Sequence, residues 1–283
     1  MKVKFIEIDG VMTRLLVEGK ETNMPLLLLH GYGGTADLWF RNIDALSDQF
    51  YVIAPDLYGS GFNDKPSLGG KPSHGFAVKH LCALIEKLNL RSLALCGSSY
   101  GALIACLTYL AMPERVAKLI INGSGSTFNS DEQLTAGISR VLEVYTPLLK
   151  EPTLASVRAT MDAHCYDPAS VPEEIIPVML TAYAMPGTFE FWLEGIHAMG
   201  NLDNIRPFRI LDRLEQIEVE TLVLWGRQDK GAIYESAVAA IDRMPNARLF
   251  TFENCGHKPM FEHAKTYNDV VRTFLTTEAW PGQ

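Results

Sequence analysis

Short runs of consecutive apolar residues recur along the chain and constrain its fold more than any other feature. Runs such as 26–29 and 222–225 hold no polar residue that could face water, so each predicts a strand covered on both faces of a sheet. Strands are predicted over Lys4–Ile8, Thr13–Val17, Pro25–Leu29, Tyr51–Ala54, Ser92–Cys96, Ala117–Ile121, Thr221–Trp225 and Arg248–Phe252. Helices are predicted over Asp37–Gln49, Phe76–Leu90, Tyr100–Met112, Ala232–Met244 and His263–Thr276.

This alternation of strands and helices predicts an α/β fold, in which helices flank an eight-stranded and mostly parallel sheet. The first two strands alternate apolar and polar residues and are expected to form an antiparallel edge. The alternation stops between about residues 126 and 212, where a helical pattern interrupted by prolines is too long for a loop. We therefore predict an α/β core of residues 1–125 and 213–283, with a helical cap of residues 126–212 inserted after the sixth strand.

The charge and the cysteines exclude several classes of protein. The 283-residue chain has a formal net charge of −8, which argues against a nucleic-acid partner because phosphate binding needs clustered Lys and Arg. Its five cysteines are scattered without a close CxxC pair, so no zinc site or dithiol motif is predicted. Reduced core thiols in a cytoplasmic protein are expected. We predict no cofactor and a small-molecule substrate, and nothing in the sequence indicates an oligomeric state.

One uncharged stretch, from Ser92 to Met112, is long enough to span a bilayer. A cluster of glycine and serine at 97–101 interrupts it, so a buried strand, a tight turn and a buried helix explain it better than a membrane span. The N-terminal residues 1–8 alternate like a strand and lack the apolar core of a signal peptide, so none is predicted.

The turn after the fifth strand carries the first sign of chemistry, the sequence Gly97-Ser98-Ser99-Tyr100-Gly101. In an open parallel sheet, ligands bind at the carboxyl ends of the strands. The G-x-S-x-G pattern between a strand and a helix is typical of a sharp turn that exposes the serine hydroxyl. Ser99 is therefore the predicted nucleophile, and the N-terminus of the following helix favours a developing negative charge.

A serine hydroxyl needs a base to take its proton and an acid to orient that base. Asp229 follows the seventh strand and His257 follows the eighth, so both belong to the edge of the sheet where Ser99 is expected. The loop 30–34, after the third strand, fits an oxyanion loop. We predict that the backbone N–H groups of Tyr32 and Tyr100 converge on the oxyanion. No metal is predicted at this site.

These elements, in this chain order, resemble the serine hydrolases of the α/β-hydrolase superfamily from about Met1 to Leu275. The stretch 54–61 resembles the superfamily's loop after its fourth strand, and Gly256-His257 followed by Glu262-His263 resembles the stretch with the catalytic histidine. In haloalkane dehalogenases and epoxide hydrolases the nucleophile is an aspartate, so Ser99 argues against both. The resemblance implies attack by Ser99, proton transfer by His257, orientation of the imidazole by Asp229, and an acyl-enzyme that water hydrolyses.

Within the superfamily, the predicted cap resembles that of the meta-cleavage-product hydrolases, which split carbon–carbon bonds of vinylogous diketones. The stretches that carry the resemblance are Pro152-Thr153, Cys165-Tyr166-Asp167-Pro168 and Pro172-Glu173-Glu174. Three positions depart from that family. Ser98 stands where the family usually has asparagine, Lys258 stands where it has tryptophan, and Met179 falls near the cap arginine that grips the substrate carboxylate.

These departures favour a shared cap with a different substrate, and the main hypothesis is hydrolysis of a carboxylic ester of a small, hydrophobic molecule. Trp192 and Phe189 belong to an apolar stripe of the cap that either packs on the sheet or forms the roof of the substrate pocket. Gly31 and Lys258 are the other predicted pocket residues.

Two further functions stay open from the sequence. One is carbon–carbon hydrolysis of the meta-cleavage type, and the other is a ligand sensor that keeps the three catalytic side chains but turns over negligibly. The two histidines of the cap, His164 and His197, are predicted to lie on the surface or to line the pocket rather than to take part in chemistry.

Overall fold

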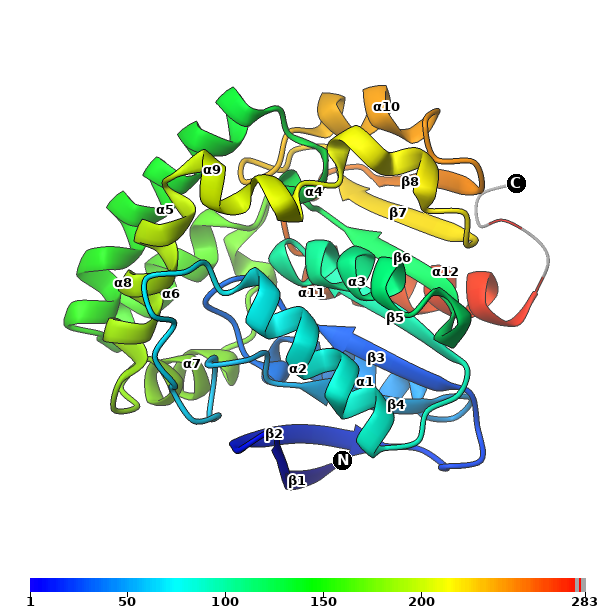
Figure 1. The fold of residues 1–283 in the computed structure, drawn as a ribbon, viewed down its shortest axis with the longest axis horizontal. Coiled ribbons are helices and arrows are strands. Elements are labelled where there is room, and N and C mark those ends of the chain that lie inside the picture. Colours follow the sequence, from blue (N-terminus) through cyan, green and yellow to red (C-terminus); the bar gives the residue numbers. More distant parts are fainter. Residues whose placement is uncertain (278–279, 281–283) are drawn as a thin grey trace.

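A single eight-stranded sheet runs through the middle of the molecule (Figure 1). The structure is a computed structural model that describes residues 1–277 and 280. The strands are β1 (Lys2–Ile8), β2 (Val11–Glu18), β3 (Pro25–Leu29), β4 (Tyr51–Pro55), β5 (Leu93–Ser98), β6 (Val116–Asn122), β7 (Thr221–Gly226) and β8 (Ala247–Phe252). They lie in the order β1-β2-β4-β3-β5-β6-β7-β8. Every predicted strand is present with small differences at its ends.

The direction of the strands also follows the prediction. β1 pairs antiparallel with β2, and β2 pairs antiparallel with β4, while the other pairs are parallel. In the parallel part, Leu29 of β3 is opposite Gly97 of β5, and Ser98 is opposite Asn122 of β6. Asn122 is in turn opposite Leu224 of β7. The carboxyl ends of four strands therefore meet at one edge of the sheet, and their loops are brought together there.

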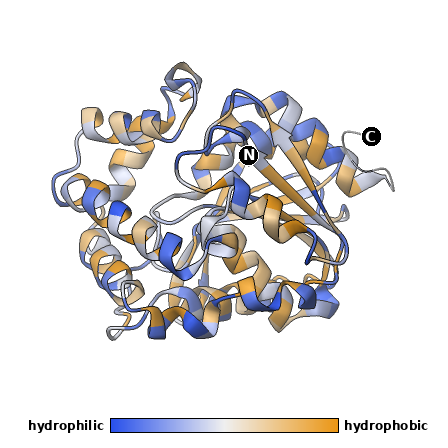
Figure 2. Cartoon of the chain, turned by 90° about the horizontal axis from the view of Figure 1, so that it is seen from above, coloured by the Kyte–Doolittle hydropathy of each residue, from blue (hydrophilic) through white to orange (hydrophobic). Residues whose placement is uncertain are grey.

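Helices cover both faces of the sheet because side chains of a strand alternate between its faces. Leu26 and Leu28 pack into one apolar cluster with α1, α11 and α12, whereas Leu27 and Leu29 pack into another with α2, α3 and α10. All four leucines are fully buried. The helices are α1 (Phe40–Leu46), α2 (His74–Lys87), α3 (Tyr100–Ala111), α10 (Tyr234–Ile241), α11 (Pro259–Glu262) and α12 (Ala264–Thr276). Figure 2 shows the mostly hydrophobic strands between helices of mixed character.

One predicted helix, over Ala232–Met244, is too long, because α10 begins only at Tyr234 and ends at Ile241. Ile233 is extended, and the carbonyl of Ala232 accepts a hydrogen bond from the Trp225 indole at 3.3 Å. The apolar periodicity therefore continues through residues that form turns rather than helix.

A helical segment lies between β6 and β7 and occupies the left of Figure 1, beside the carboxyl edge of the sheet. It consists of α4 (Gly125–Phe128), α5 (Asp131–Lys150), α6 (Leu154–Ala163), α7 (Ile175–Tyr183), α8 (Thr188–Met199) and α9 (Leu202–Ile205), with short 3-10 turns between and after them. Ser130 caps α5 and Thr153 caps α6, each in a capping box that satisfies the free amides of the first turn.

The uncharged stretch from Ser92 to Met112 divides into β5, a tight turn and α3. Within residues 1–277 and 280, none of the helices is both long and apolar enough to cross a bilayer. The five cysteines are free thiols, and all except Cys82 are buried.

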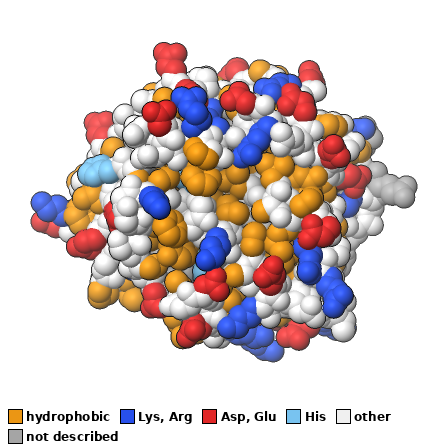
Figure 3. Space-filling view, viewed as in Figure 1, with side chains coloured by type: hydrophobic (Ala, Val, Ile, Leu, Met, Phe, Trp, Pro, Cys, Tyr) orange, Lys and Arg blue, Asp and Glu red, His pale blue; other side chains and the backbone are white. Residues whose placement is uncertain are grey.

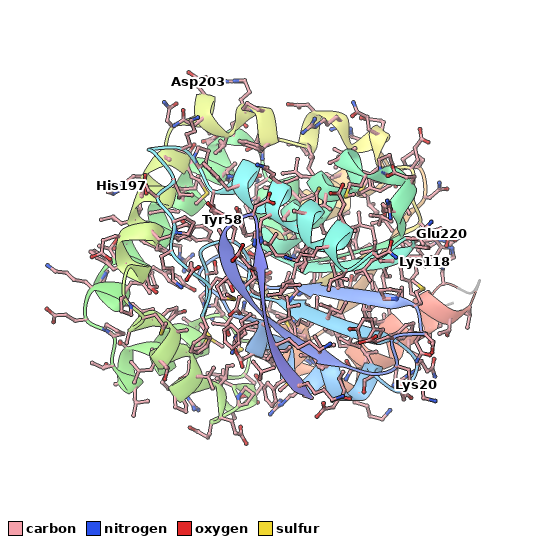
Figure 4. The ribbon with its side chains drawn as sticks, turned by 60° about the horizontal axis from the view of Figure 1, so that its bottom comes forward. Lys20, Tyr58, Lys118, His197, Asp203 and Glu220 are labelled. Atoms are coloured by element: carbon pink, nitrogen blue, oxygen red, sulfur yellow. The ribbon has the colours of Figure 1, made fainter. Side chains whose placement is uncertain are left out.

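The outer surface carries interspersed charges. Figure 3 shows hydrophobic side chains in the middle of one face, with acidic and basic side chains mixed around them. Lys118 of β6 and Glu220, which precedes β7, form an ion pair of 2.7 Å. In Figure 4 this pair lies at the opposite end of the molecule from His197 and Asp203, which project from the outer side of the helical segment.

A buried ion pair joins β2 to the loop after β4. Asp56 is fully buried, and its carboxylate accepts hydrogen bonds from Arg14 Nε at 2.8 Å and Nη2 at 3.0 Å. It also accepts from the backbone N–H groups of Ala36 at 2.7 Å and Phe62 at 2.9 Å. Asp37 is the second acidic partner of Arg14. Asp56 therefore fixes the loops on either side of β4 to the sheet.

We predict that Asp56→Ala lowers the free energy of unfolding by about 3–5 kcal/mol, because it leaves the Arg14 guanidinium buried without its main partner. Urea denaturation of the wild type and the variant measures the difference. The control is Glu114→Ala, which removes a carboxylate that is 69% exposed beside Arg115 and is expected to change stability by less than about 0.5 kcal/mol. A loss below about 1 kcal/mol for Asp56→Ala would contradict this role.

Candidate active site

Ser99 stands in a strained turn between β5 and α3. Its backbone has φ 54° and ψ −119°, a conformation that residues with a side chain rarely adopt. The turn is tight because a Cβ on Gly97 would come within 2.3 Å of the Gly101 carbonyl oxygen. A Cβ on Gly101 would come within 2.4 Å of the carbonyl oxygen of His30. Only glycine fits at both positions, as the G-x-S-x-G pattern predicts.

Hydrogen bonds to neighbouring loops hold this turn in place. The Ser99 N–H donates to the carbonyl of Asn122 at 2.8 Å, and the hydroxyl of Ser124 donates to the Ser99 carbonyl at 2.7 Å. The residue between them, Gly123, has φ +51°, and a Cβ there would lie 3.3 Å from Asp229 Oδ2 and 3.4 Å from His257 Nδ1. The end of β6 therefore touches the serine turn on one side and the Asp229–His257 pair on the other.

His257 and Asp229 are joined by a hydrogen bond of 2.7 Å between Nδ1 and Oδ2. The side chain of Asp229 is fully buried, and that of His257 is 7% exposed. The other carboxylate oxygen, Oδ1, accepts from the N–H groups of Gly231 at 2.7 Å and Ala232 at 2.9 Å. Because a carboxylate can only accept, Nδ1 carries the proton and Nε2 is left with a lone pair. This is the tautomer that can take a proton from a hydroxyl.

The loop 30–34 passes directly over the serine. A Cβ on Gly31 would lie 3.2 Å from Ser99 Cβ and 3.8 Å from its Oγ. Among the described residues, the backbone N–H groups of Tyr32 and Tyr100 find no acceptor. These two donors belong to the loop 30–34 and to the start of α3, the two segments next to Ser99 from which the oxyanion donors were predicted.

His30 braces this loop from behind. The Leu57 N–H donates to His30 Nε2 at 2.9 Å, so Nε2 is the acceptor and Nδ1 donates to the Gly31 carbonyl at 2.8 Å. Burial lowers the pKa of His30 and keeps the ring neutral. Because both ring nitrogens of His30 already form hydrogen bonds, His30 holds the conformation of the loop and is not available for proton transfer.

The loop that carries His257 is clamped to the helical segment. The His257 N–H donates to the carbonyl of His164 at 2.7 Å. Glu262 accepts from the Gly256 N–H through Oε1 at 2.9 Å and from the Tyr166 N–H through Oε2 at 2.6 Å. A Cβ on Gly256 would come within 2.7 Å of both the His164 oxygen and the Tyr166 nitrogen. The absence of a side chain at Gly256 is what lets the two segments approach.

A chain of aromatic rings encloses the site and includes residues that the sequence did not single out. Tyr100 contacts Tyr32 with ring centroids 5.3 Å apart, and Tyr32 contacts Trp192 at 6.0 Å. Trp192 stacks on Tyr145 at 5.9 Å, and Tyr145 lies edge-on to His164 at 6.2 Å. His164 is the last member, with its ring 5.7 Å from that of His257. The spacing of apolar residues in the sequence does not identify Tyr145 or His164 as part of the site, because they reach it only through tertiary packing.

A cavity of about 150 Å³ opens beside Ser99. Its lining is mostly apolar, and Leu103, Ile138 and Val141 are typical members. Tyr32, Tyr100 and Gly231 also line it, and Gly231 packs against Asp229 and His257. The cavity therefore extends from Ser99 to the loop that carries Asp229.

The four predicted pocket residues lie in different places. Gly31 is in contact with Ser99, and Trp192 lines a second cavity of about 30 Å³ under the oxyanion loop. Phe189 packs at the edge of an apolar cluster and is not part of the larger cavity's wall. Lys258 is 7% exposed, and burial lowers its pKa. His197 is exposed on the outer side of α8 (Figure 4).

The other two positions that differ from the meta-cleavage-product hydrolases, Ser98 and Met179, are also buried. Ser98 is fully buried, and its hydroxyl accepts from Asn122 Nδ2 at 3.1 Å. Met179 of α7 is 1% exposed, and its sulfur is 3.7 Å from the Thr35 hydroxyl. Within the part of the chain that the structure describes, no group of three or more His, Cys, Asp or Glu side chains has the arrangement of a metal site.

The chain matches a known family over most of its length. Residues 24–264 fit the model of the alpha/beta hydrolase fold, so the chain belongs to the α/β-hydrolase family. The eight-stranded sheet, its strand directions and the helical insertion after β6 agree with this assignment.

Comparison with individual relatives gives more detail than the family does. The chain is 32% identical to 2-hydroxy-6-oxononadienedioate/2-hydroxy-6-oxononatrienedioate hydrolase 1 of Pseudomonas putida, covering 92% of this chain and 89% of that protein. It is 29% identical to 2-hydroxymuconate semialdehyde hydrolase of Pseudomonas putida, covering 92% of each. The solved meta-cleavage product hydrolase from Pseudomonas fluorescens IP01 has a TM-score of 0.79 at 26% identity, covering 96% of this chain and 97% of that one.

A putative lipase from Acinetobacter baumannii AYE shares the fold, with a TM-score of 0.84 at 24% identity, covering 97% of this chain and 90% of that one. The predicted membership of the superfamily and the predicted likeness to meta-cleavage product hydrolases are confirmed by these comparisons. They favour the carbon–carbon alternative over ester hydrolysis, which finds support only at the level of the family.

We predict that Gly256→Ala lowers the free energy of unfolding by about 1–3 kcal/mol, because the new Cβ would overlap backbone atoms of residues 164–166. Denaturant unfolding measures the loss. Gly137→Ala in α5 is the matched control, since a Cβ there meets nothing within 4 Å and alanine is expected to stabilise the helix by about 0.5–1 kcal/mol. Equal effects of the two substitutions would contradict the close approach of the two segments.

Proposed function

We propose that this protein hydrolyses a carbon–carbon bond beside a ketone in an acidic, conjugated dienone, with Ser99 as the nucleophile. The observation that carries the proposal is the bond between His257 Nδ1 and Asp229 next to the strained turn of Ser99. It leaves the lone pair on Nε2, the nitrogen that would take the proton of Ser99. The choice of bond is supported by relatives of 29–32% identity that are named as hydrolases of 2-hydroxy-6-oxo acids.

In the first step, the Ser99 hydroxyl attacks the ketone carbon while His257 Nε2 takes its proton. Asp229 stabilises the resulting imidazolium through the Nδ1 hydrogen bond. The negative charge that develops on the ketone oxygen is held by the N–H groups of Tyr32 and Tyr100, and each such donor is worth about 3–4 kcal/mol of the barrier. Within residues 1–277 and 280 both donors lack an acceptor, so they need not break a bond to these residues to act.

The second step acts on the keto tautomer of the substrate, in which a proton has moved from the 2-hydroxyl to the carbon beside the ketone and made that carbon saturated. The bond between the former ketone carbon and this saturated neighbour breaks, and its electron pair passes through the adjacent double bond to the 2-oxygen. The imidazolium of His257 protonates the dienolate that leaves. The acyl group remains on Ser99 as an ester. Water, activated by the now neutral His257, then releases it as a carboxylic acid. A carbon leaving group needs this conjugation because an isolated carbanion is too basic to depart.

We further propose that residues 126–212 act as a cap that excludes water and shapes the substrate site. Trp192 and Tyr145 supply aromatic walls, and Gly31 keeps the space above Ser99 open. The cavity of about 150 Å³ would hold the apolar part of the substrate. In this scheme Phe189 supports the cap and Lys258 is close to the reacting groups.

Ester hydrolysis is the second candidate, and one observation favours it. Met179 is buried and apolar where a carboxylate-gripping cation was expected for an acidic dienone. An ester needs only Ser99, His257, Asp229 and the two oxyanion donors, because an alcohol leaves without conjugation.

We predict turnover of 2-hydroxy-6-oxonona-2,4-dienedioate at about 1–100 s⁻¹, with cleavage of p-nitrophenyl acetate at least tenfold slower in kcat/KM. Loss of the dienone absorbance measures the first reaction, and release of p-nitrophenolate measures the second. Ser99→Ala is expected to lower both rates at least 10³-fold. Efficient cleavage of the ester without turnover of the dienone would favour ester hydrolysis, and tight dienone binding without turnover of either would favour a ligand sensor.

We predict that Asp229→Asn lowers kcat about 10³–10⁴-fold with little change in KM, because an amide favours the wrong tautomer of His257. Steady-state kinetics on the better substrate measure the change. Lys230→Gln, an exposed neighbour in the same loop, serves as the control. A loss of less than tenfold in Asp229→Asn would show that Asp229 serves only the turn at Gly231 and Ala232.

A further inference from the structure

Lys258 is a buried cation that the chemistry proposed above does not use. It follows His257 directly in the chain, and only 7% of its surface is exposed. Within residues 1–277 and 280, its ammonium has neither an ion-pair partner nor a hydrogen-bond acceptor. A buried charge without a partner is costly, and proteins rarely keep one that has no use.

The two carboxylates whose charges act on Lys258, those of Asp229 and Glu262, already have hydrogen-bond partners. Asp229 binds His257, Gly231 and Ala232, and Glu262 binds the amides that join the His257 loop to the helical segment. Neither can swing toward the ammonium without breaking these bonds. The part of the chain that the structure describes therefore leaves no free carboxylate for Lys258 among these neighbours.

The ammonium lies near two histidines of the site. Its charge contributes to lowering the pKa of His30 behind the loop 30–34 and of His164 beside His257. A small part of the residue, 7% of its surface, remains accessible.

His164 offers the complementary group. Its Nδ1 donates to the Thr160 carbonyl at 2.7 Å, so Nε2 holds the lone pair, and this atom too lacks a partner in the described part without being enclosed. Burial lowers the pKa of His164 to about 3, so the ring stays neutral and does not repel the ammonium. The base His257 is thus flanked by one cationic donor and one neutral acceptor.

We propose that Lys258 binds the substrate carboxylate and that His164 Nε2 accepts a hydrogen bond from a hydroxyl on the adjacent carbon. This inference rests on the proposed function and adds which residues recognise the 2-hydroxy acid, which enters with its acid end toward the His257 loop. The positive charge that binds the substrate carboxylate then comes from the loop with His257. Met179, on α7, does not bind the carboxylate.

Binding measurements in a Ser99→Ala background test the subsite separately from catalysis. The ligands are 2-hydroxy-6-oxo-6-phenylhexa-2,4-dienoate and its methyl ester, which differ only in the charge of the acid end. Ser99→Ala is expected to bind the acid more tightly, and adding Lys258→Met is expected to lower this preference about 10–100-fold. Lys258→Arg should keep the preference within about fivefold of Ser99→Ala, since it retains the positive charge.

Lys230→Met is the control for charge alone, because it removes an exposed ammonium from the loop that carries Asp229. It is expected to change the acid-to-ester preference less than threefold. An equal loss for Lys230→Met and Lys258→Met, or an unchanged preference in Lys258→Met, overturns the proposal. If wild-type enzyme fails to cleave the dienone while Lys258→Met still abolishes the preference for the acid, the proposed reaction fails and the subsite stands.

Two further readouts separate binding from a structural role. Lys258→Met is expected to melt at the same or a higher temperature than its parent, because it removes an unpaired buried charge. A clear drop would mean that the lysine stabilises the fold and would overturn the assignment. His164→Phe is expected to lower the preference for the 2-hydroxy acid over its 2-methoxy ether about tenfold, and no change would remove His164 from the subsite.

Discussion

The left-handed backbone of Ser99 is the constraint on which the rest of the site depends. A non-glycine residue in a sparsely populated conformation costs about 1–3 kcal/mol, so the surrounding structure has to hold it there. The ends of β5 and β6 and the first turn of α3 do so. Gly97 and Gly101 remove the side chains that would block the turn, and Asn122 and Ser124 bond to the backbone of Ser99. The sheet therefore stabilises a conformation that isolated turn residues would not keep, and the hydroxyl is exposed as a result.

His257 is held from two sides by groups of different origin. Asp229, from the core, fixes the imidazole ring, whereas His164, from the helical segment, binds the backbone of His257. Glu262 completes the link by binding an amide on each side. A movement of the helical segment would therefore also displace His257. In the proposed mechanism, this arrangement couples the position of the helical segment to the geometry of proton transfer.

The proposed chemistry and the proposed specificity have separate structural sources. Ser99, Asp229, His257 and the two amide donors lie in the turns and loops that follow strands of the sheet. The aromatic walls and the cavity beside Ser99 are built largely by α5, α8 and the loops that face them. Because one fold hosts many functions, the fold by itself leaves the bond to be cleaved open.

The sequence by itself determined the eight strands, the main helices of the core and the chain order of the predicted catalytic residues, because these depend on periodicity and on short local motifs. It placed the ends of α10 wrongly, since apolar spacing continued through residues whose backbone bonds form turns. Three features follow from the tertiary structure alone: Glu262 binds two loops, His164 faces His257, and Lys258 has no partner among residues 1–277 and 280. Whether a polar atom is paired depends on contacts between residues far apart in the chain, and no local pattern encodes such contacts.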